Sequence, residues 1–253
     1  MASVSLVRIA RHCDALLRIR EIHDYPGAVN GLQVENRGAV TKIAAAVDAS
    51  PATARKAIAI GADLLVVHHG LFWSPRQPWT GTHYALMRLL LEGNLAVYSA
   101  HLPLDAHPQL GNNARLCAAL GFRGLQPFFV REGTPLGWRT ATRLRRDELA
   151  LRLAGAVGGR VEVIPGGPEI CRRIGVVTGG AGSEVKRAFE EGVDTFITGE
   201  GPHWSFALAE ELGINVLYAG HYATETFGVK ALAEALSRKF RVPWVFVDHP
   251  TGL

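Results

Sequence analysis

Cysteine is scarce in this 253-residue sequence, and its few cysteines are not arranged as metal-binding or disulfide pairs. Cys13, Cys117 and Cys171 are odd in number, lie far apart and show no Cys-x-x-Cys spacing. This pattern argues against a disulfide framework and against a closed cysteine zinc site. We expect the three thiols to be small buried side chains of the core.

Long hydrophobic runs are also missing, because no apolar stretch reaches the length of a membrane-spanning helix. The first eleven residues contain neither a long apolar segment nor a small-residue cleavage site, so we expect a cytoplasmic protein. Hydrophobic residues still make up 48% of the composition, which is enough to fill a substantial core. The length fits one large α/β domain or two smaller lobes that share an interface.

A strong excess of one charge is lacking as well, since 27 basic residues against 23 acidic ones leave a net charge of +4. The basic residues are scattered, apart from a cluster formed by Arg139, Arg143, Arg145 and Arg146. Such a cluster can bind phosphate or nucleic acid, although a solvated surface run is the commoner case. Charge therefore leaves a nucleic-acid partner open without favouring it.

Short apolar segments alternate with amphipathic ones along the chain, which is the order typical of βα units. Parallel strands are covered on both faces and therefore read as continuous apolar runs. By this criterion buried strands are predicted at 43–47, 64–67, 96–100, 173–177, 195–198 and 215–218. We predict an α/β fold with two βα lobes, in which mostly parallel or mixed sheets are covered by helices. The lobes are expected over residues 1–130 and 131–253.

Three segments are harder to assign. Residues 124–169 are rich in glycine, proline and arginine, and we interpret them as a hinge between the lobes, with a strand at 128–130 and a helix at 148–157. The segment 101–107 is predicted to be a loop, because Pro103 disfavours regular structure before it. The glycine-rich turn 178–183 lacks the lysine of a phosphate-binding loop, so a tight strand-to-helix turn is favoured.

Metal-ligating side chains stand at or beyond the ends of three predicted strands: His68 and His69, His101 with Asp105, and His221 with Glu225. Ligands gather outside the carboxyl ends of the strands in open α/β sheets. Successive strand side chains point to opposite sides, so adjacent histidines suit two neighbouring ions better than one. Glu225 lies four residues after His221, on the same face of a helix that begins there.

Imidazole nitrogen and carboxylate oxygen favour Zn²⁺, Fe²⁺, Mn²⁺ or a similar divalent ion. Five such side chains exceed what one tetrahedral ion with an open position requires, and they fit two ions per subunit. Such a pair would hold a bridging hydroxide and polarise a carbonyl or phosphoryl oxygen. Ordinary roles exist as well, because Asp105 can form an Asx turn and Glu225 can favour a helix N-terminus.

The sequence resembles the NIF-three-like family of dinuclear metal centre proteins, which are also described as GTP cyclohydrolase 1 type 2 homologues. The resemblance covers nearly the whole chain, and its motifs are specific jointly rather than singly. They are Asn-Gly-Leu-Gln-Val at 30–34, Val-His-His-Gly at 67–70, His-Leu-Pro-Leu-Asp at 101–105, Gly-Asn-Asn at 111–113, Thr-Gly-Glu at 198–200 and Gly-His-Tyr-Ala-Thr-Glu at 220–225.

The resemblance implies that His68 and Asp105 hold one ion and that His69 and His221 hold the other. It implies that Glu225 bridges the two ions. The metal site would lie in the crevice between the lobes. By the same resemblance, the subunits would assemble into a toroidal homohexamer.

Two further residues take catalytic roles by resemblance. His101 is similar to an additional site histidine that either moves protons or supports a metal ligand without binding the ion, and Glu200 matches a glutamate that faces the cavity. Some family members carry a ferredoxin-like domain between the lobes, and the segment 124–169 is too short to contain it. We therefore expect a single NIF-three-like domain overall.

Two classes of function are consistent with these observations. The first is a metal-dependent hydrolase acting on a small molecule, in which a metal-bridging hydroxide attacks the substrate. A GTP cyclohydrolase would have to open an imidazole ring, and no residue identifies a guanine pocket, although Trp73, Trp79 or Tyr222 can stack a base. The second is a metal-binding, ring-shaped scaffold or regulatory protein that interacts with proteins or nucleic acid. An open coordination position favours the first class, and saturated coordination favours the second.

Overall fold

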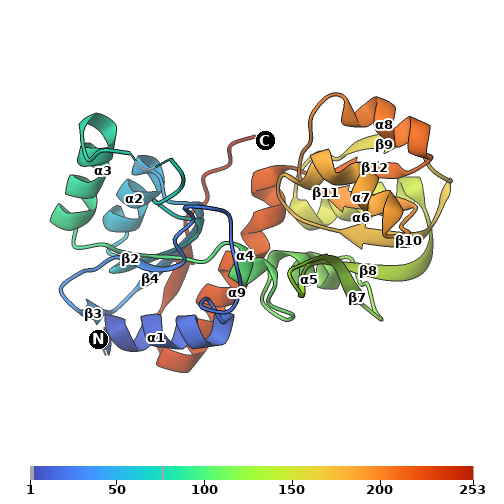
Figure 1. Ribbon diagram of the computed structural model, residues 1–253. Coiled ribbons are helices and arrows are strands. Elements are labelled where there is room, and N and C mark those ends of the chain that lie inside the picture. Colours follow the sequence, from blue (N-terminus) through green and yellow to red (C-terminus); the bar gives the residue numbers. More distant parts are fainter. Residues whose placement is uncertain (1–2, 76, 253) are drawn as a thin grey trace. The chain divides into compact units, whose positions relative to one another are not determined.

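The chain forms two compact units in the computed structural model, which describes residues 3–75 and 77–252 (Figure 1). The first unit consists of Met1–His107 and Gly228–His249, and the second of Pro108–Phe227 and Pro250–Leu253. The chain passes from one unit to the other after His107, inside the last helix, α9 (His221–Phe240), and after His249. A division at residue 130 would make the units two consecutive halves, whereas the contacts group most of α9 with the first unit.

A five-stranded sheet forms the centre of the first unit. Its strands lie in the order β13 (Trp244–Phe246), β4 (Ile43–Asp48), β5 (Leu64–His69), β6 (Ala96–Ser99) and β2 (Gly31–Val34). The first four strands are parallel, and β2 pairs with β6 in the antiparallel direction. A separate antiparallel pair consists of β1 (Val4–Ser5) and β3 (Ala39–Val40). The strands predicted from continuous apolar runs are therefore present.

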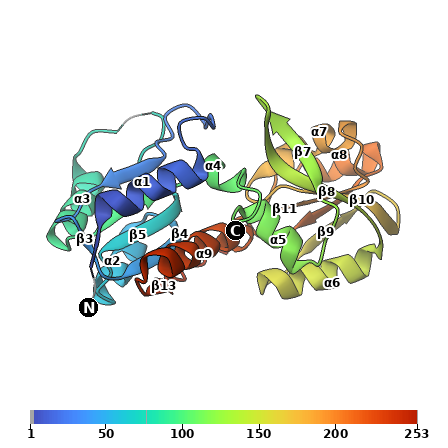
Figure 2. The same cartoon turned by 90° about the horizontal axis from the view of Figure 1, so that it is seen from below.

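Helices cover both faces of this sheet (Figures 1 and 2). One face carries α2 (Pro51–Ala59) and α3 (Gly81–Glu92), whose apolar side chains pack on Leu65 and Val67 of β5. The other carries α1 (Leu6–Leu17) and the end of α9, where the ring of His12 meets that of Phe240. Because both faces of β5 are covered, its alternate side chains are buried on both sides.

The second unit contains a six-stranded mixed sheet. The strand order is β7 (Gln126–Arg131), β8 (Thr134–Arg145), β10 (Ile170–Val176), β11 (Thr195–Thr198), β12 (Asn215–Tyr218) and β9 (Glu162–Pro165). Only β10, β11 and β12 run parallel to one another; the other neighbouring strands are antiparallel. The expected fold class, with mixed sheets covered by helices, is confirmed in both units.

Two hydrophobic clusters lie on opposite faces of this second sheet. The helices are α5 (Asn112–Ala119) and α6 (Arg146–Val157) on one face, and α7 (Val185–Glu190), preceded by a 3₁₀ turn at Ala181–Glu184, and α8 (Ser205–Leu212) on the other. Neighbouring residues of β11 alternate between these clusters. Ile197 packs on the α5 and α6 side, whereas Phe196 packs on the α7 and α8 side.

The segment 124–169 is not the hinge that its composition suggested. It forms β7, β8, α6 and β9, which contribute half of the strands in the second sheet. One of its glycines, Gly137 of β8, and Gly175 of the neighbouring strand β10 have a packing role. Gly137 and Gly175 lie against Phe128, and a Cβ atom built on Gly175 would come within 2.5 Å of the Phe128 ring. Glycine here allows close packing, which composition alone does not distinguish from loop formation.

The expected loop at 101–107 is also partly wrong, because Leu102–Asp105 forms a short helix, α4. Pro103 lies in its first turn, where a backbone N–H has no partner within the helix and proline is tolerated. Proline is therefore compatible with this turn of helix, which begins at Leu102. The turn determines where Asp105 lies.

The three cysteines are buried, as expected from their number and spacing. Burial raises the pKa of Cys117 to about 12, so this thiol is not a reactive group at neutral pH. Among the helices in the described part of the chain, none has both the length and the apolarity that a membrane span requires.

The contact between Gly175 and Phe128 gives a test of the packing in the second unit. Gly175→Ala forces a methyl group against the ring, so we expect a loss of about 1–3 kcal/mol in the free energy of unfolding. The matched control is Gly155→Ala in α6, where an added Cβ meets no neighbour within 4 Å and helix propensity predicts a gain. Urea unfolding curves measure the free energy of unfolding of both variants. Equal changes in the two variants would contradict the close contact between Gly175 and Phe128.

Candidate metal centre

Three histidines lie together at the carboxyl ends of β5 and β6 in the first unit. Strand β5 continues through both His68 and His69, and β6 is parallel to it and ends two residues before His101. The ring of His68 lies 4.9 Å from that of His69 and 4.8 Å from that of His101. One ligand atom from each side chain lies within 4.8 Å of the others, so the group can hold a metal ion.

Each of these rings is oriented by a hydrogen bond to its Nδ1 atom. The partners are the Ala100 carbonyl for His68 at 2.9 Å, the Asp48 carboxylate for His69 at 2.8 Å and the Asp24 carboxylate for His101 at 2.8 Å. Metal-binding histidines typically donate one ring N–H to a carboxylate or carbonyl, which fixes the tautomer and the ring orientation. A metal would therefore be bound through Nε2 of each ring.

Asp48 and Asp24 were missed as site residues, because their positions in the sequence suggest ordinary helix boundaries. Helix α2 is capped instead by Ser50, which forms a capping box with Thr53. Asp48 ends β4 and is paired in register with His69 on β5. A carboxylate at the end of the neighbouring strand is the signal that could have identified it.

Asp24 lies at the centre of a small hydrogen-bond network. Its carboxylate accepts hydrogen bonds from Asn30 Nδ2 at 2.8 Å and from the Leu102 backbone N–H at 3.1 Å, in addition to its contact with His101. Burial by itself would raise the pKa of Asp24. The hydrogen bond and charge of His101, together with the bonds from Asn30 and Tyr25, outweigh that effect and lower the pKa to about 2.

The motif at 30–34 supports the histidine group through the backbone. Asn30 Oδ1 accepts the His101 backbone N–H at 2.7 Å, and Gln33 Oε1 accepts the Leu71 N–H at 2.7 Å. Gly70 lies directly against the Gln33 side chain, and a Cβ atom at this position would collide with it. These contacts set the path of the chain on both sides of the histidines.

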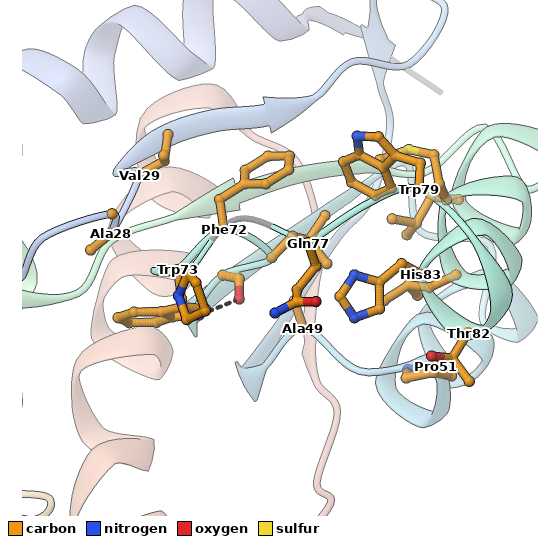
Figure 3. Close-up of a pocket in the computed structure, with 17 residues that line it drawn as sticks. Ala28, Val29, Ala49, Pro51, Phe72, Trp73, Gln77, Trp79, Thr82 and His83 are labelled. Atoms are coloured by element: carbon orange, nitrogen blue, oxygen red, sulfur yellow. Dashed lines mark hydrogen bonds between the residues drawn. The ribbon is translucent and has the colours of Figure 1, made fainter.

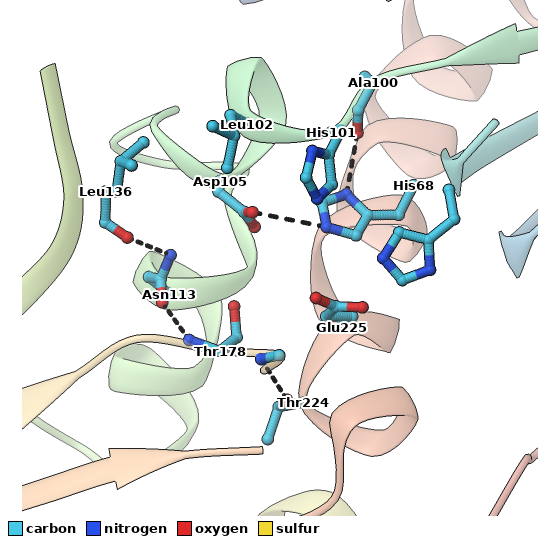
Figure 4. Close-up of polar contacts among 12 residues, drawn as sticks. His68, Ala100, His101, Leu102, Asp105, Asn113, Leu136, Thr178, Thr224 and Glu225 are labelled. Carbon is cyan, nitrogen blue, oxygen red and sulfur yellow. Dashed lines mark hydrogen bonds and ion pairs between the residues drawn. The ribbon is translucent and has the colours of Figure 1, made fainter. Parts of the chain in front are cut away.

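Asp105 reaches the same group from helix α4 (Figure 4). Its carboxylate Oδ2 lies 3.4 Å from Nε2 of His68, and both side chains are buried. Burying a carboxylate is costly unless a partner compensates its charge. His68 and Asp105 therefore lie next to each other, and the prediction that they hold one ion remains a prediction.

Within the second unit, His221, Glu225 and Glu200 lie together. Helix α9 begins at His221, so His221 and Glu225 project from one face, with Nε2 and Oε2 3.2 Å apart. Glu200 follows β11 and its Oε1 lies 2.7 Å from His221 Nδ1. Glu200 therefore orients this ring, as Asp48 orients that of His69.

Two carboxylates hold a proton on His221 in the metal-free protein. The hydrogen bond to Glu225 raises its pKa, burial opposes this, and the charge of Glu225 together with the hydrogen bond and charge of Glu200 raises it further, to about 9. A divalent ion binds neutral imidazole and would replace that proton. The site thus has the negative charge that a metal cation requires.

The turn at 178–183 packs closely around these side chains. A Cβ atom at Gly179 would collide with Glu225 Oε1, and one at Gly180 would lie 3.5 Å from the His221 ring. The Gly179 N–H donates to Thr224 Oγ1 at 3.0 Å, and the Thr178 N–H donates to Asn113 Oδ1 at 2.7 Å (Figure 4). The glycines let this backbone approach α9, and the turn joins β10 to a 3₁₀ segment, in agreement with a tight strand-to-helix connection.

The donor set among the described residues is of the kind that binds a divalent ion. Imidazole nitrogens with buried carboxylate oxygens suit Zn²⁺, Fe²⁺ or Mn²⁺. The first unit supplies His68, His69, His101 and Asp105. The second supplies His221 and Glu225, with Gly179 leaving space beside the carboxylate.

Comparison with known proteins identifies the family. A GTP cyclohydrolase 1 type 2 homolog from Deinococcus radiodurans is 42% identical over 234 residues, which cover 90% of this chain and 88% of the relative. One from Archaeoglobus fulgidus is 39% identical over 250 residues, covering 99% and 100%. A crystal structure from Thermus thermophilus is 42% identical, with a TM-score of 0.91 and coverage of 99% and 100%.

The family model Duf34/NIF3 (NGG1p interacting factor 3) matches residues 4–251. The chain belongs to this family, which confirms the resemblance recognised in the sequence motifs. The relatives span nearly the whole chain, so membership applies to both units rather than to one of them.

Close packing of Gly179 against Glu225 predicts the effect of a single methyl group. Gly179→Ala should displace Glu225 and weaken metal binding by roughly tenfold or more, because a misplaced ligand loses its optimum geometry. Gly158→Ala is the matched control: it has a similar left-handed φ, and its added Cβ meets no neighbour. Both variants place alanine at a left-handed φ and bear the same backbone strain. Equal metal affinities of the two variants in competition titrations would therefore show that the added Cβ does not disturb Glu225.

Proposed function

We propose that the protein is a divalent-metal-dependent hydrolase with two ions per subunit. His68, His69, Asp105, His221 and Glu225 would be the ligands, with Glu225 bridging. The observation that carries the proposal is the orientation of each ligand histidine through Nδ1, by Asp48, Glu200 or a backbone carbonyl.

The two ions, when bound, would lower the pKa of a water molecule and polarise an electrophilic oxygen of the substrate. The chain's own residues would position the metal ligands and transfer protons to and from the substrate. Asp24 holds His101 through Nδ1, so His101 can accept and return a proton at Nε2 beside the substrate. Since His101 also lies in the three-histidine group, it can serve as an additional ligand. Glu200 keeps His221 in the orientation that binding requires.

Hydrolysis agrees with the name of the curated relatives. A GTP cyclohydrolase opens a ring by adding water, which is the same class of reaction as amide or phosphoester hydrolysis. The shared name supports the class of reaction for this chain and does not extend to its substrate. The proposal therefore concerns water addition to a small electrophilic molecule.

The clustered arginines do not favour the scaffold alternative. Arg139 donates to the Glu191 carbonyl, Arg146 donates to Asn215, and Arg145 forms an ion pair with Glu169. These contacts hold the chain's own strands and helices. A nucleic-acid surface would instead present such side chains to phosphate groups.

The decisive experiment measures metal content and activity together. Protein reconstituted with Zn²⁺, Fe²⁺ or Mn²⁺ should contain two ions per chain by elemental analysis, and one of these forms should hydrolyse a member of a panel of phosphoesters, cyclic amides and nucleotides. His69→Ala and Glu225→Ala should lower the metal content and abolish the activity while circular dichroism shows an intact fold.

Full activity in both variants would refute the hydrolase proposal for this site. A metal content of two ions with no hydrolysis of the panel and saturated coordination by X-ray absorption would favour the scaffold. The two outcomes are separable, because metal content is measured independently of turnover.

Asp48 provides a test of ring orientation. Asp48→Asn keeps the size of the side chain but removes the charge beside His69, and we expect the affinity for the metal to fall roughly 10- to 100-fold. Asp147→Asn on the surface of α6 is the control, since its carboxylate is 75% exposed and belongs to the second unit. Competition with a chelating dye measures both affinities; a change of less than twofold for Asp48→Asn would argue against the proposed role.

We also propose a homo-oligomer, specifically a homohexamer with a toroidal shape, as the family resemblance implies. Light scattering of the metal-loaded protein should then report six times the mass of the 27.3 kDa chain. A stable species of 27.3 kDa at micromolar concentration would contradict this expectation.

A further inference from the structure

A pocket of about 670 Å³ lies beside the histidine group, entirely within the first unit (Figure 3). It is formed by described residues of the segment that follows β5, by helix α3, by residues 27–29, and by Ala49 and Pro51. Its volume is in the range of small-molecule binding sites. Because β5 delivers His68 and His69 and then continues into this segment, the pocket and the histidines share one piece of chain.

Aromatic rings line this pocket from more than one side. Phe72 and Trp79 meet edge to face, with their centroids 5.7 Å apart, and Trp73 lines the pocket beyond them (Figure 3). Leu86 and Met87 of α3 add apolar surface. Trp79 is 49% exposed, so its indole presents a flat face that the core does not use. Flat rings bind well against such faces, through stacking and edge-to-face contacts.

The described lining residues of this pocket include no aspartate, glutamate, lysine or arginine. Their polar side chains are Gln77, Thr82 and His83. Among these described residues a buried phosphate or carboxylate finds no cationic partner of the kind that a buried anion requires. Their chemistry therefore favours a neutral ligand, with a few hydrogen bonds at its edge.

Trp73 connects the pocket to the histidine group. Its indole Nε1 donates to the Gly70 carbonyl at 2.9 Å, which fixes the ring. The same indole lies edge to face with His101, centroids 5.1 Å apart, and with His69 at 6.2 Å. A ligand in the pocket therefore contacts a wall whose other neighbours are the candidate metal ligands.

We propose that this pocket binds a neutral, planar aromatic or heteroaromatic ring of the substrate. The hydrolysable group is attached to that ring and extends past Trp73 toward His69 and His101. Hydrolysis breaks one bond of that group: the OH of a water molecule adds to one fragment and its H to the other. No further reactant is needed. The assignment of the ring to a substrate rests on the proposed hydrolase function. Trp73 and Trp79 are positioning residues, because they contact the ring and not the bond that breaks.

The test uses 1-naphthol and decahydro-1-naphthol as probes, with the full-length protein in isothermal titration calorimetry. Both probes are neutral and share one carbon skeleton, but only 1-naphthol is flat. We expect 1-naphthol to bind roughly tenfold or more tightly than the saturated alcohol, because stacking on an aromatic side chain is lost in the latter. Equal affinities for the two alcohols would overturn the proposal.

Two variants locate the binding. Trp79→Leu should weaken 1-naphthol binding roughly 10-fold or more, and Thr82→Trp should block it by filling the pocket from α3 without removing core contacts. Trp204→Leu is the matched control, because that indole is 52% exposed and lies in the second unit. Unchanged affinity in both pocket variants would overturn the assignment, as would a loss of affinity only in Trp204→Leu.

Metal-free protein and Glu225→Ala separate this inference from the proposed function. The pocket is built without metal ligands, so both proteins should bind 1-naphthol as the wild-type protein does. Ring binding without any hydrolysis would refute the hydrolase and leave the ring pocket standing. Hydrolysis without ring binding would refute the pocket and leave the hydrolase. A second copy of the chain covering the pocket would also prevent probe binding, and that result counts against the proposal.

Discussion

Hydrogen bonds to the Nδ1 atoms of the histidines are the constraint on which the candidate metal centre depends. An imidazole at a strand end can rotate, and it offers a metal either of its nitrogens until one of them is occupied. In this protein Asp48, Asp24, Glu200 and the Ala100 carbonyl occupy Nδ1 in His69, His101, His221 and His68, respectively. Each ring is thereby directed to bind through Nε2, and the carboxylates also supply negative charge.

The pairing of strands in the two sheets brings these carboxylates next to their histidines. Asp48 meets His69 because β4 and β5 are parallel neighbours and their ends are in register. Glu200 meets His221 because β11 and β12 are likewise parallel and both continue into turns at the same edge. Parallel pairing brings carboxyl ends together, and the turns that follow them are where polar side chains can be oriented without breaking the apolar interior.

Close backbone approach is the second requirement, and glycine meets it. Gly179 leaves space for Glu225, and Gly70 leaves space for Gln33, which holds the turn that follows His69. The same turn leads into the aromatic pocket, where Trp73 is fixed by the Gly70 carbonyl. Ligand orientation, chain path and pocket wall are thus set by a few neighbouring residues in the first unit.

Much of the fold could be predicted from the sequence, because a strand buried on both faces has a local signature. Strands β4, β5, β6, β10, β11 and β12 were identified from continuous apolar runs, and β7 was predicted at 128–130. Strand β8 was missed, since an antiparallel strand with one solvated face carries arginine and threonine, and its glycine resembles a loop residue. Helix α4 was missed because proline is read as a breaker, although it is compatible with a first helical turn.

The sequence by itself determined which residue types stand at the strand ends, and its motifs were enough to recognise the family. Tertiary structure decided the rest: which carboxylate orients which histidine, which glycine makes room for which side chain, and where aromatic rings line a pocket. The physical reason is the distance along the sequence over which each interaction acts. Periodicity and capping depend on neighbours within about four residues, whereas Asp24 and His101 are 77 positions apart and meet only through the folded chain.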